Sequence, residues 1–289
     1  MLKNLLIVLF FTTFLSADIT DYEIKPSSLK TSQFMNIKIL DSKELRFSSS
    51  QINELSALAY EKDTLYALGD KGFLHKFIIL IKDNKIKKIS LQKTIKLKGD
   101  KLDSEGLVLK DDKLLISFER KPKVVLYSKD GKKIKKKKIH KELRDIKEYK
   151  RKNKALEAVA YNKKYGVLTA PELPLKKSNK NYHTLYSKKR KWDFSACGSI
   201  TALEFMSKDE VMVLQRDFNS LTRRRVTTIS KLNLKNLEYK ILAKLDTQKG
   251  WNIDNFEGLT KVDEKKYLMI SDDNNSFFQK TLLVLFEVD

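Results

Sequence analysis

A short motif recurs five times along this 289-residue chain, and the repeat constrains the fold more than any other feature. Each copy is a Ser, Thr or Glu followed by a small residue and then an aliphatic one. Successive copies start 49, 52, 44 and 56 residues apart. The copies are Ser56-Ala57-Leu58, Glu105-Gly106-Leu107, Glu157-Ala158-Val159, Thr201-Ala202-Leu203 and Glu257-Gly258-Leu259. Self-similarity at such a period indicates that each unit is one supersecondary motif in a repeat architecture.

Each copy begins a short apolar strand, which a polar turn joins to a second strand. We expect the second strands over residues 64–69, 113–118, 165–170, 210–215 and 266–271. Further strand-like runs follow within the units, such as 123–128 and 132–139 in the second. Four short strands in a unit of this length are typical of β-propeller blades. The expected fold is therefore all-β, a propeller of four-stranded blades.

The repeat count predicts five blades. The fifth unit ends at Asp289 after three strands, the last over 281–288, so we expect the ring to be closed by a strand over 34–40. Six blades remain open, because a further blade could lie within residues 18–55 or inside the 56-residue unit. One helix is expected, over 141–154, where Leu143 and Ile146 share a face.

The first 17 residues have the features of a signal peptide. Lys3 precedes an apolar stretch over 5–15, and Ala17 offers a small residue at a cleavage position before Asp18. We therefore expect a signal peptide over 1–17, a single propeller domain over 18–289 and a periplasmic or secreted location. An uncleaved membrane anchor is the alternative, although the apolar stretch is short for a bilayer span.

The chain is strongly basic, with 59 Lys and Arg against 37 Asp and Glu and a formal net charge of +22. Most of the excess is Lys spread along the sequence, a pattern typical of a solvated surface. The run 132–138 holds six Lys and no aromatic residue. We expect it to be an outer strand, where Lys discourages edge-to-edge pairing. We expect no nucleic-acid partner, no membrane-spanning segment after residue 17, and a monomer.

Cysteine and histidine offer little chemistry. Cys197 stands alone, which excludes an intramolecular disulfide, and we expect a buried structural thiol. The three histidines, His75, His140 and His183, lack the spacing of a zinc site or of a Ser-His-Asp triad. His183 stays open as an acid or base.

Each second strand runs into an acidic residue: Asp70, Glu119, Glu172, Asp217 and Asp272. The first two strands of a blade are antiparallel partners, so the start of the first lies beside the end of the second. Innermost strands face the central channel, and these acids should form a ring at one end of it. The expected neighbours are Glu105 with Glu119, Glu157 with Glu172, and Glu257 with Asp272.

Carboxylates held close together need a cation or a proton. An oxygen-only donor set favours Ca²⁺ over zinc or copper. The expected metal ligands are Glu105, Glu119, Glu157, Glu172, Glu257 and Asp272. Two alternatives stay open: the glutamates accept hydrogen bonds from neighbouring blades and staple the ring, or Ca²⁺ is a structural ion.

Cations alternate with these acids, and Lys71, Arg120 and Arg216 are the expected ligands for a substrate anion. The alternative is that Arg120 and Arg216 only neutralise their acidic neighbours. A further cluster, 223–225, is Arg-Arg-Arg in the loop after the second strand of the fourth unit. Two interpretations stay open for it: a solvated loop, or an extension of the anion-binding surface.

Six segments, in order, resemble the phytase-like family, known for "esterase-like activity of phytase". They are Asp103-Ser104-Glu105-Gly106-Leu107, Ser117-Phe118-Glu119-Arg120, Leu156-Glu157-Ala158-Val159-Ala160, Leu214-Gln215-Arg216-Asp217-Phe218, Asn255-Phe256-Glu257-Gly258-Leu259 and Ile270-Ser271-Asp272-Asp273-Asn274. The resemblance implies a secreted or periplasmic propeller that hydrolyses phosphate or other esters with Ca²⁺. Ser56 and Thr201 replace the motif Glu, and Gln215 replaces an acid often found before the Arg, so two sectors of the ring are less acidic.

Two functions stay open from the sequence. One is a metal-assisted hydrolase acting on a small anionic ester at the acidic face of the channel. The other is a non-enzymatic periplasmic propeller that binds a ligand or a protein partner through the same face, because a propeller serves binding as readily as catalysis. No side chain is identified as the nucleophile.

Overall fold

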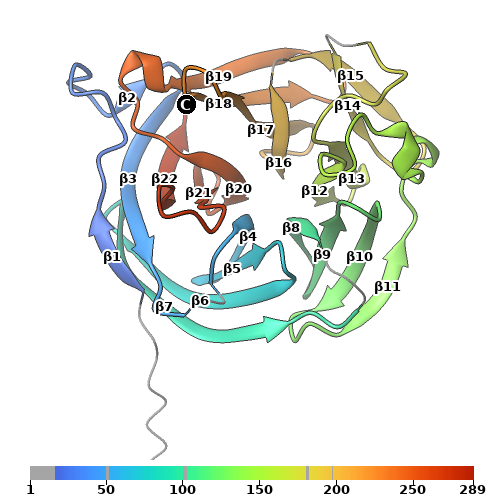
Figure 1. Cartoon of the computed structure of the whole chain (residues 1–289), viewed down its shortest axis with the longest axis horizontal. Helices are drawn as coiled ribbons and strands as arrows, with labels where there is room; N and C mark the ends of the chain where they lie inside the picture. The colour runs from blue at the N-terminus through green and yellow to red at the C-terminus, as the bar shows by residue number, and fades with distance from the viewer. Residues whose placement is uncertain (1–16, 50–51, 100–102, 180–181, 197) are drawn as a thin grey trace, which may run out of the picture.

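The protein is a five-bladed β-propeller in the computed structural model, which describes residues 17–49, 52–99, 103–179, 182–196 and 198–289 (Figure 1). Each blade is an antiparallel sheet whose first strand lies nearest the central axis. The prediction of an all-β propeller is confirmed. So is the count of five, since residues 18–46 complete the fifth blade and the 56-residue unit forms one blade of long strands.

The blades follow one another along the chain. The first contains β4 (Leu55–Glu61), β5 (Thr64–Gly69), β6 (Phe73–Lys82) and β7 (Lys85–Lys96). The second contains β8 (Ser104–Lys110), β9 (Lys113–Phe118), β10 (Lys123–Ser128) and β11 (Lys133–Lys137). The third contains β12 (Leu156–Asn162), β13 (Gly166–Pro171), β14 (Tyr182–Tyr186) and β15 (Lys191–Ser195). The fourth contains β16 (Ser199–Phe205), β17 (Glu210–Asn219), β18 (Arg224–Asn233) and β19 (Tyr239–Asp246). The fifth contains β20 (Asn255–Lys261), β21 (Lys266–Asp272), β22 (Thr281–Val288) and β3 (Ile37–Arg46).

The start of the chain closes the ring, but later than predicted. β3 pairs antiparallel with β22, so the fourth strand of the fifth blade begins at Ile37 and not at Phe34. Phe34 lies in the short strand β2 (Gln33–Phe34), which pairs back onto β3. A turn with Met35 at φ 54° separates the two strands, and this break was not visible in the apolar pattern. β1 (Asp18–Asp21) then adds to the outer edge of β3.

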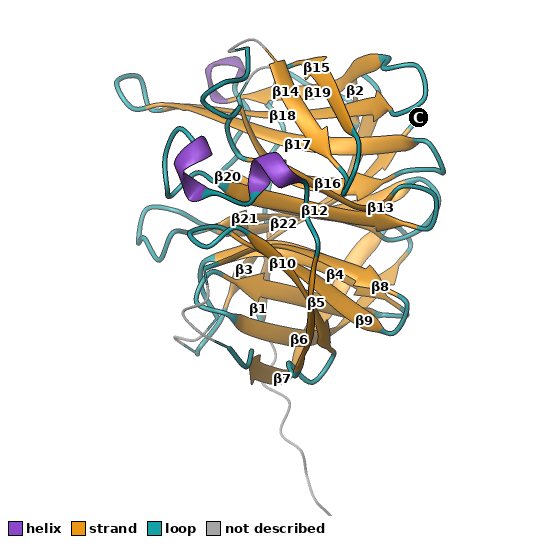
Figure 2. Cartoon of the chain, turned by 90° about the vertical axis from the view of Figure 1, so that its right-hand side faces the viewer, coloured by secondary structure: helices purple, strands orange, loops and turns teal. Residues whose placement is uncertain are grey.

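The predicted helix over 141–154 is wrong. This segment forms two 3-10 turns, η1 (Lys141–Leu143) and η2 (Ile146–Glu148), in the connection between β11 and β12 (Figure 2). A third 3-10 turn, η3 (Thr247–Lys249), lies in the connection between β19 and β20. The Asp145 side chain accepts a hydrogen bond from the backbone N–H of Lys147 and starts a new turn, which interrupts the helix. Leu143 is fully buried, so the apolar signal came from packing and not from a helical face.

Small residues of the repeated motif let the inner strands approach one another. A Cβ atom added at Gly106 would lie 2.8 Å from the carbonyl oxygen of Glu157, on the inner strand of the next blade. One added at Gly258 would lie 3.1 Å from the Cα of Ala57. The motif therefore requires a small residue at these positions, because the neighbouring backbone occupies the space of a side chain.

Apolar side chains fill the space between neighbouring blades. One such cluster joins the third and fourth blades through Leu185, Phe194, Ile200 and Val213. His75 and His183 are buried within β6 and β14, while Cys197 lies outside the described residues. None of the helical segments in the described part of the chain has the length and hydrophobicity that a bilayer crossing requires.

Candidate functional site

Acidic residues gather where the inner strands begin and their partners end. β8 and β9 pair so that Ser104 opposes Phe118, and β20 and β21 pair so that Asn255 opposes Asp272. The acids next to these positions therefore lie at one end of the channel, as predicted. They form two clusters, which we call the first and second carboxylate triads.

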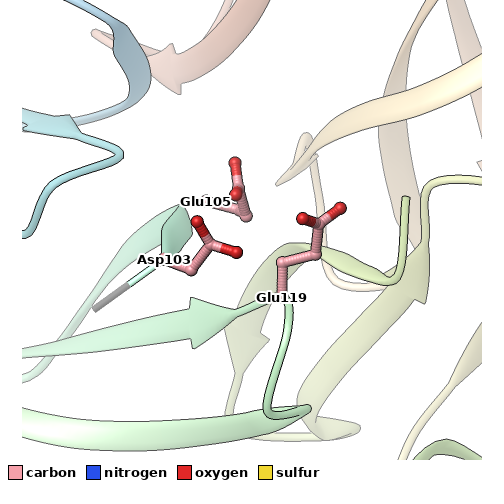
Figure 3. Close-up of side chains that lie close together, drawn as sticks. All are labelled: Asp103, Glu105 and Glu119. Atoms are coloured by element: carbon pink, nitrogen blue, oxygen red, sulfur yellow. The ribbon is translucent and has the colours of Figure 1, made fainter. Parts of the chain in front are cut away.

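The first carboxylate triad is Asp103, Glu105 and Glu119, all from the second blade (Figure 3). One carboxylate oxygen of each residue lies within 4.8 Å of the others. Asp103 directly precedes β8 and Glu105 is the second residue of this strand, whose pairing with β9 shifts register between Ser104 and Leu107. Ser104 between them points elsewhere, and its hydroxyl donates a hydrogen bond to the Gly69 carbonyl at 2.8 Å.

The second carboxylate triad is Glu119, Glu157 and Glu172, and all three side chains are buried. Their oxygens also lie within 4.8 Å of one another. Glu119 belongs to both triads, which are therefore continuous across the boundary between the second and third blades. Four of the six predicted metal ligands thus come together in these triads.

The carboxylates differ in how well protein donors satisfy them. Glu119 accepts a hydrogen bond from the backbone N–H of Ala155 at 2.9 Å, and Glu172 pairs with the Lys154 ammonium at 2.5 Å. Among the described residues, no donor hydrogen-bonds to the carboxylates of Glu105 or Glu157. Both carboxylates are thus available to a cation or a proton.

In the first and fourth blades the repeated motif carries Ser56 or Thr201 in place of Glu, and each hydroxyl donates a hydrogen bond to the backbone of the next blade. Ser56 donates to the Ser104 carbonyl at 3.3 Å, and Thr201 donates to the Phe256 carbonyl at 3.2 Å. The alternative in which ring glutamates staple neighbouring blades by hydrogen bonds fits one residue of the triads, Glu119, which accepts a hydrogen bond from the backbone of the next blade. It does not describe Glu105 or Glu157.

Burial and mutual repulsion raise the pKa of the ring acids. Burial, with the charges of Asp103 and Glu172 adding to it, raises the pKa of Glu119 to about 7. Burial together with the charge of Glu257 raises the pKa of Asp70 to about 8 and that of Asp272 to about 9. The pKa values of Glu105 and Glu157 are also raised, by burial first and then by the surrounding carboxylates.

The fourth blade contributes the cation Arg216 to the ring, and not an acid. The Arg216 guanidinium lies 3.0 Å from Glu257 and 3.4 Å from Glu172, and its Nη1 donates to the Asn255 side chain at 2.6 Å. Asp217, the acid expected here, is exposed. β17 continues to Asn219, beyond the predicted end at residue 215, so Asp217 lies within the strand and points outward.

The other residues of the predicted ring lie away from the two triads or at their edge. Glu257 is held by Arg216, and the Asp272 carboxylate accepts the backbone N–H of Asn274 at 2.7 Å. Lys71 pairs with Glu54 on the surface. Arg120 is mostly exposed and lies 3.0 Å from the first-triad carboxylate of Asp103. The three predicted anion-binding cations therefore do not converge.

A cleft of about 390 Å³ adjoins Arg216, and its lining includes Arg223 and Arg225 together with the acids Asp217 and Asp254. Arg223 makes no ion pair with a described residue, whereas Arg225 lies 3.5 Å from Asp254. Arg224, between them, points to Asp246 at 2.6 Å. The three arginines were expected in a loop, but Arg224 and Arg225 belong to β18, and only Arg223 lies in the turn before it. Arg223 and Arg225 thus line a cleft of mixed charge beside the acidic ring.

Two residues of the site were not predicted. Asp103 stands two positions before Glu105, just before β8 begins, and an acid so close to the motif Glu was a signal that could have identified it. Lys154 lies in the segment predicted as a helix, and nothing in the local sequence indicates that its ammonium pairs with Glu172.

Fold and site together define a five-bladed β-propeller with an acidic centre at one end of its channel. The family model described as "Phytase-like: Esterase-like activity of phytase" matches residues 50–275, and the chain belongs to this family. A comparison with curated proteins finds no match.

Several solved structures are similar to this chain in arrangement but distant in sequence. A chain in "Crystal Structure of Mitotic Checkpoint Complex" is 12% identical, with a TM-score of 0.40, over 86% of this chain and 68% of the other. "Structure of U3-55K" is 8% identical, with a TM-score of 0.43, over 82% and 62%. The computationally designed Ika8 protein is 12% identical, with a TM-score of 0.37, over 89% and 82%.

Proposed function

We propose that the protein is an exported, metal-assisted hydrolase of phosphate or other esters, with its site at the acidic end of the channel. The observation that carries the proposal is the pair of carboxylate triads sharing Glu119, in which Glu105 and Glu157 have no donor among the described residues. Membership of the phytase-like family supports an ester as the substrate.

We propose Ca²⁺ as the metal. The available donors are carboxylate oxygens, which Ca²⁺ and other hard cations prefer, and Ca²⁺ tolerates irregular sets of six to eight oxygen ligands. The residues that would hold it are Asp103, Glu105, Glu119, Glu157 and Glu172. Bound Ca²⁺ supplies charge to offset a substrate anion and lowers the pKa of a bound water.

The cleft lined by Arg216, Arg223 and Arg225 is the proposed seat of the substrate anion. Both Nη groups of Arg216 are engaged by ring residues, so its proposed role is to hold Glu172 and Glu257 in place. Arg223 makes no ion pair with a described residue and is the proposed contact to phosphate oxygens, for which the Arg fork is suited, while Arg225 would share its guanidinium between the anion and Asp254.

Glu119 is the proposed ligand that both triads share. Its pKa in the metal-free protein is about 7, so a metal ion that binds near neutral pH would displace the proton from this carboxylate. Arg216 and Lys154 both pair with Glu172 and fix the position of its carboxylate beside Glu119.

Export rests on the features of residues 1–17. β1 begins at Asp18, directly after the proposed cleavage site, and pairs with β3. Sequencing the amino terminus of protein recovered from the periplasm or medium tests this; a mature chain starting at Asp18 supports export, and full-length protein in the cytoplasm argues against it.

The test of the activity is hydrolysis of p-nitrophenyl phosphate and phytate with and without Ca²⁺. Glu105→Gln is expected to lose turnover while keeping the fold. Glu204→Gln is the matched control, because Glu204 is also on an inner strand and also has a pKa of about 7 raised by burial, but lies at the other end of β16. Turnover that survives Glu105→Gln contradicts the proposal, and Ca²⁺ binding without turnover favours the ligand-binding propeller.

A further inference from the structure

A second cleft lies far from the acidic ring, between the outer strands of the second and third blades. It measures about 760 Å³, and we call it the basic cleft. Its cations come from β11, from the β14–β15 turn and from the ends of the inner strands: Lys110, Lys135, Lys136, Lys137, Lys138, Lys164, Lys188, Lys189 and Arg190. No acidic side chain is among its lining residues.

The basic cleft is at the opposite end of the third blade from the second carboxylate triad. Tyr161 and Gly166 line it and belong to the β12–β13 hairpin end, whereas Glu157 and Glu172 lie at the other end of the same two strands. The two sites can therefore be tested separately.

Protection of a sheet edge explains the lysines of β11 but not those across from it. Lys188, Lys189 and Arg190 are exposed in the turn of the next blade and face the same cleft. Like charges gathered on two blades repel one another and destabilise the fold unless an anion offsets them.

The described residues offer these cations almost no internal partners. Lys110 pairs with Asp111 at 2.7 Å and Lys164 with Asp209 at 2.5 Å, whereas the remaining seven make no ion pair with a described acid. The pKa of Lys137 is lowered, by burial first and then by the charges of Lys135 and Lys110. By contrast, the cleft beside η1 contains acids, and Lys191 there lies 3.5 Å from Glu142.

The aromatic rings in the basic cleft already contact other side chains of the protein. The Lys110 ammonium lies over the Tyr161 ring, 4.5 Å from its centroid. Tyr165 packs edge-on against Trp192 at 5.6 Å and stacks on Phe205 at 6.3 Å. Single-stranded nucleic acids gain much of their affinity from bases stacked on aromatic rings. This cleft therefore favours recognition through charge alone.

We propose that the basic cleft binds an anion that carries several phosphate groups and no stacking base, such as a polyphosphate chain. Seven unpaired cations around one concavity match a multivalent anion better than a single phosphate. A concave site also suits a discrete chain better than a flat lipid surface. Because the contacts are exposed, the affinity is expected to fall steeply with added salt.

The test is calorimetric titration of the full chain with inorganic tripolyphosphate and with a longer polyphosphate, in EDTA so that no metal ion bridges phosphate to the acidic ring. The variant is Lys136→Glu/Lys188→Glu/Lys189→Glu. The matched control is Lys87→Glu/Lys88→Glu/Lys93→Glu, which changes the same net charge on exposed lysines of β7, the outer strand of the first blade.

We expect the basic-cleft variant to lose affinity by about tenfold or more, because it reverses the charge of three of the seven unpaired cations. The control should keep most of its affinity. Equal losses in both variants would overturn the proposal, because binding would then follow net charge. Absence of binding at low salt would also overturn it. Tighter binding of oligothymidylate with the same number of phosphates would assign the cleft to nucleic acid, and tighter binding of anionic vesicles would assign it to a membrane.

Discussion

Glu119 and Glu157 come from different blades, yet a carboxylate oxygen of each lies within 4.8 Å of the other. Glu119 follows the second strand of the second blade, and Glu157 lies on the innermost strand of the third. An ion held between them would join two blades. Metal binding and the stability of the ring should therefore be linked.

Calcium is expected to raise the melting temperature of the metal-free protein. A ligand that binds the folded state alone adds about 2.7 kcal/mol to the free energy of unfolding at a concentration 100 times its Kd. Glu119→Gln should lose most of this gain because it removes a ligand from both triads, and Glu204→Gln should keep it. Thermal melts with and without Ca²⁺ measure the effect; an equal gain in both variants would place the ion elsewhere.

The metal-free protein should become less stable as pH rises from about 5 to 9. Glu119, Asp70 and Asp272 have folded-state pKa values of about 7, 8 and 9, above those of the unfolded chain, which are near 4. Between these values the folded state binds more protons, so raising the pH favours unfolding. Urea denaturation in EDTA across this range tests the sign. A free energy of unfolding that stays constant or increases over this range would contradict the raised pKa values of the ring acids.

Calcium should reverse this trend, because the ion replaces the protons on the carboxylates. The stabilisation by Ca²⁺ is therefore expected to grow with pH over the same range. Calorimetry in two buffers of different ionisation enthalpy would detect the protons released on binding.

Arg216→Met is expected to destabilise the fold. The substitution leaves Glu172 and Glu257 without their shared cation, and breaking a buried ion pair from one side costs about 3–5 kcal/mol. The Arg216 side chain is 26% exposed, so the lower part of that range is expected. Arg120→Met is the control: its partner is Asp103, its side chain is 70% exposed, and the cost should be about 0–1 kcal/mol. The free energy of unfolding from urea denaturation near pH 7 gives the comparison, and similar losses in the two variants would contradict the role given to Arg216.

Much of the fold was predictable because each blade repeats the same local pattern. The inner strands and their hairpin partners follow from apolar alternation, and antiparallel pairing then places Glu105 beside Glu119. The closing strand was misplaced because nothing in the apolar run around Phe34 reveals the tight turn at Met35. The helix over 141–154 was mispredicted because the burial of Leu143 resembles an amphipathic face.

The site was predictable within blades but not between them. Asp217 was assigned to the ring because the length of β17 past Gln215 depends on its pairing with β18, which no local pattern specifies. Likewise, the sequence does not indicate that Arg216 contacts acids from the third and fifth blades. Such contacts depend on how tightly the inner strands pack around the axis.

The most direct test of the central claim is phosphate release from phytate by protein stripped of metal with EDTA, before and after Ca²⁺ is restored. We predict no release in EDTA, recovery with Ca²⁺, and no recovery in the Glu119→Gln variant. Equal release in EDTA and in Ca²⁺, or full recovery in Glu119→Gln, would contradict a metal-dependent centre at the acidic end of the channel.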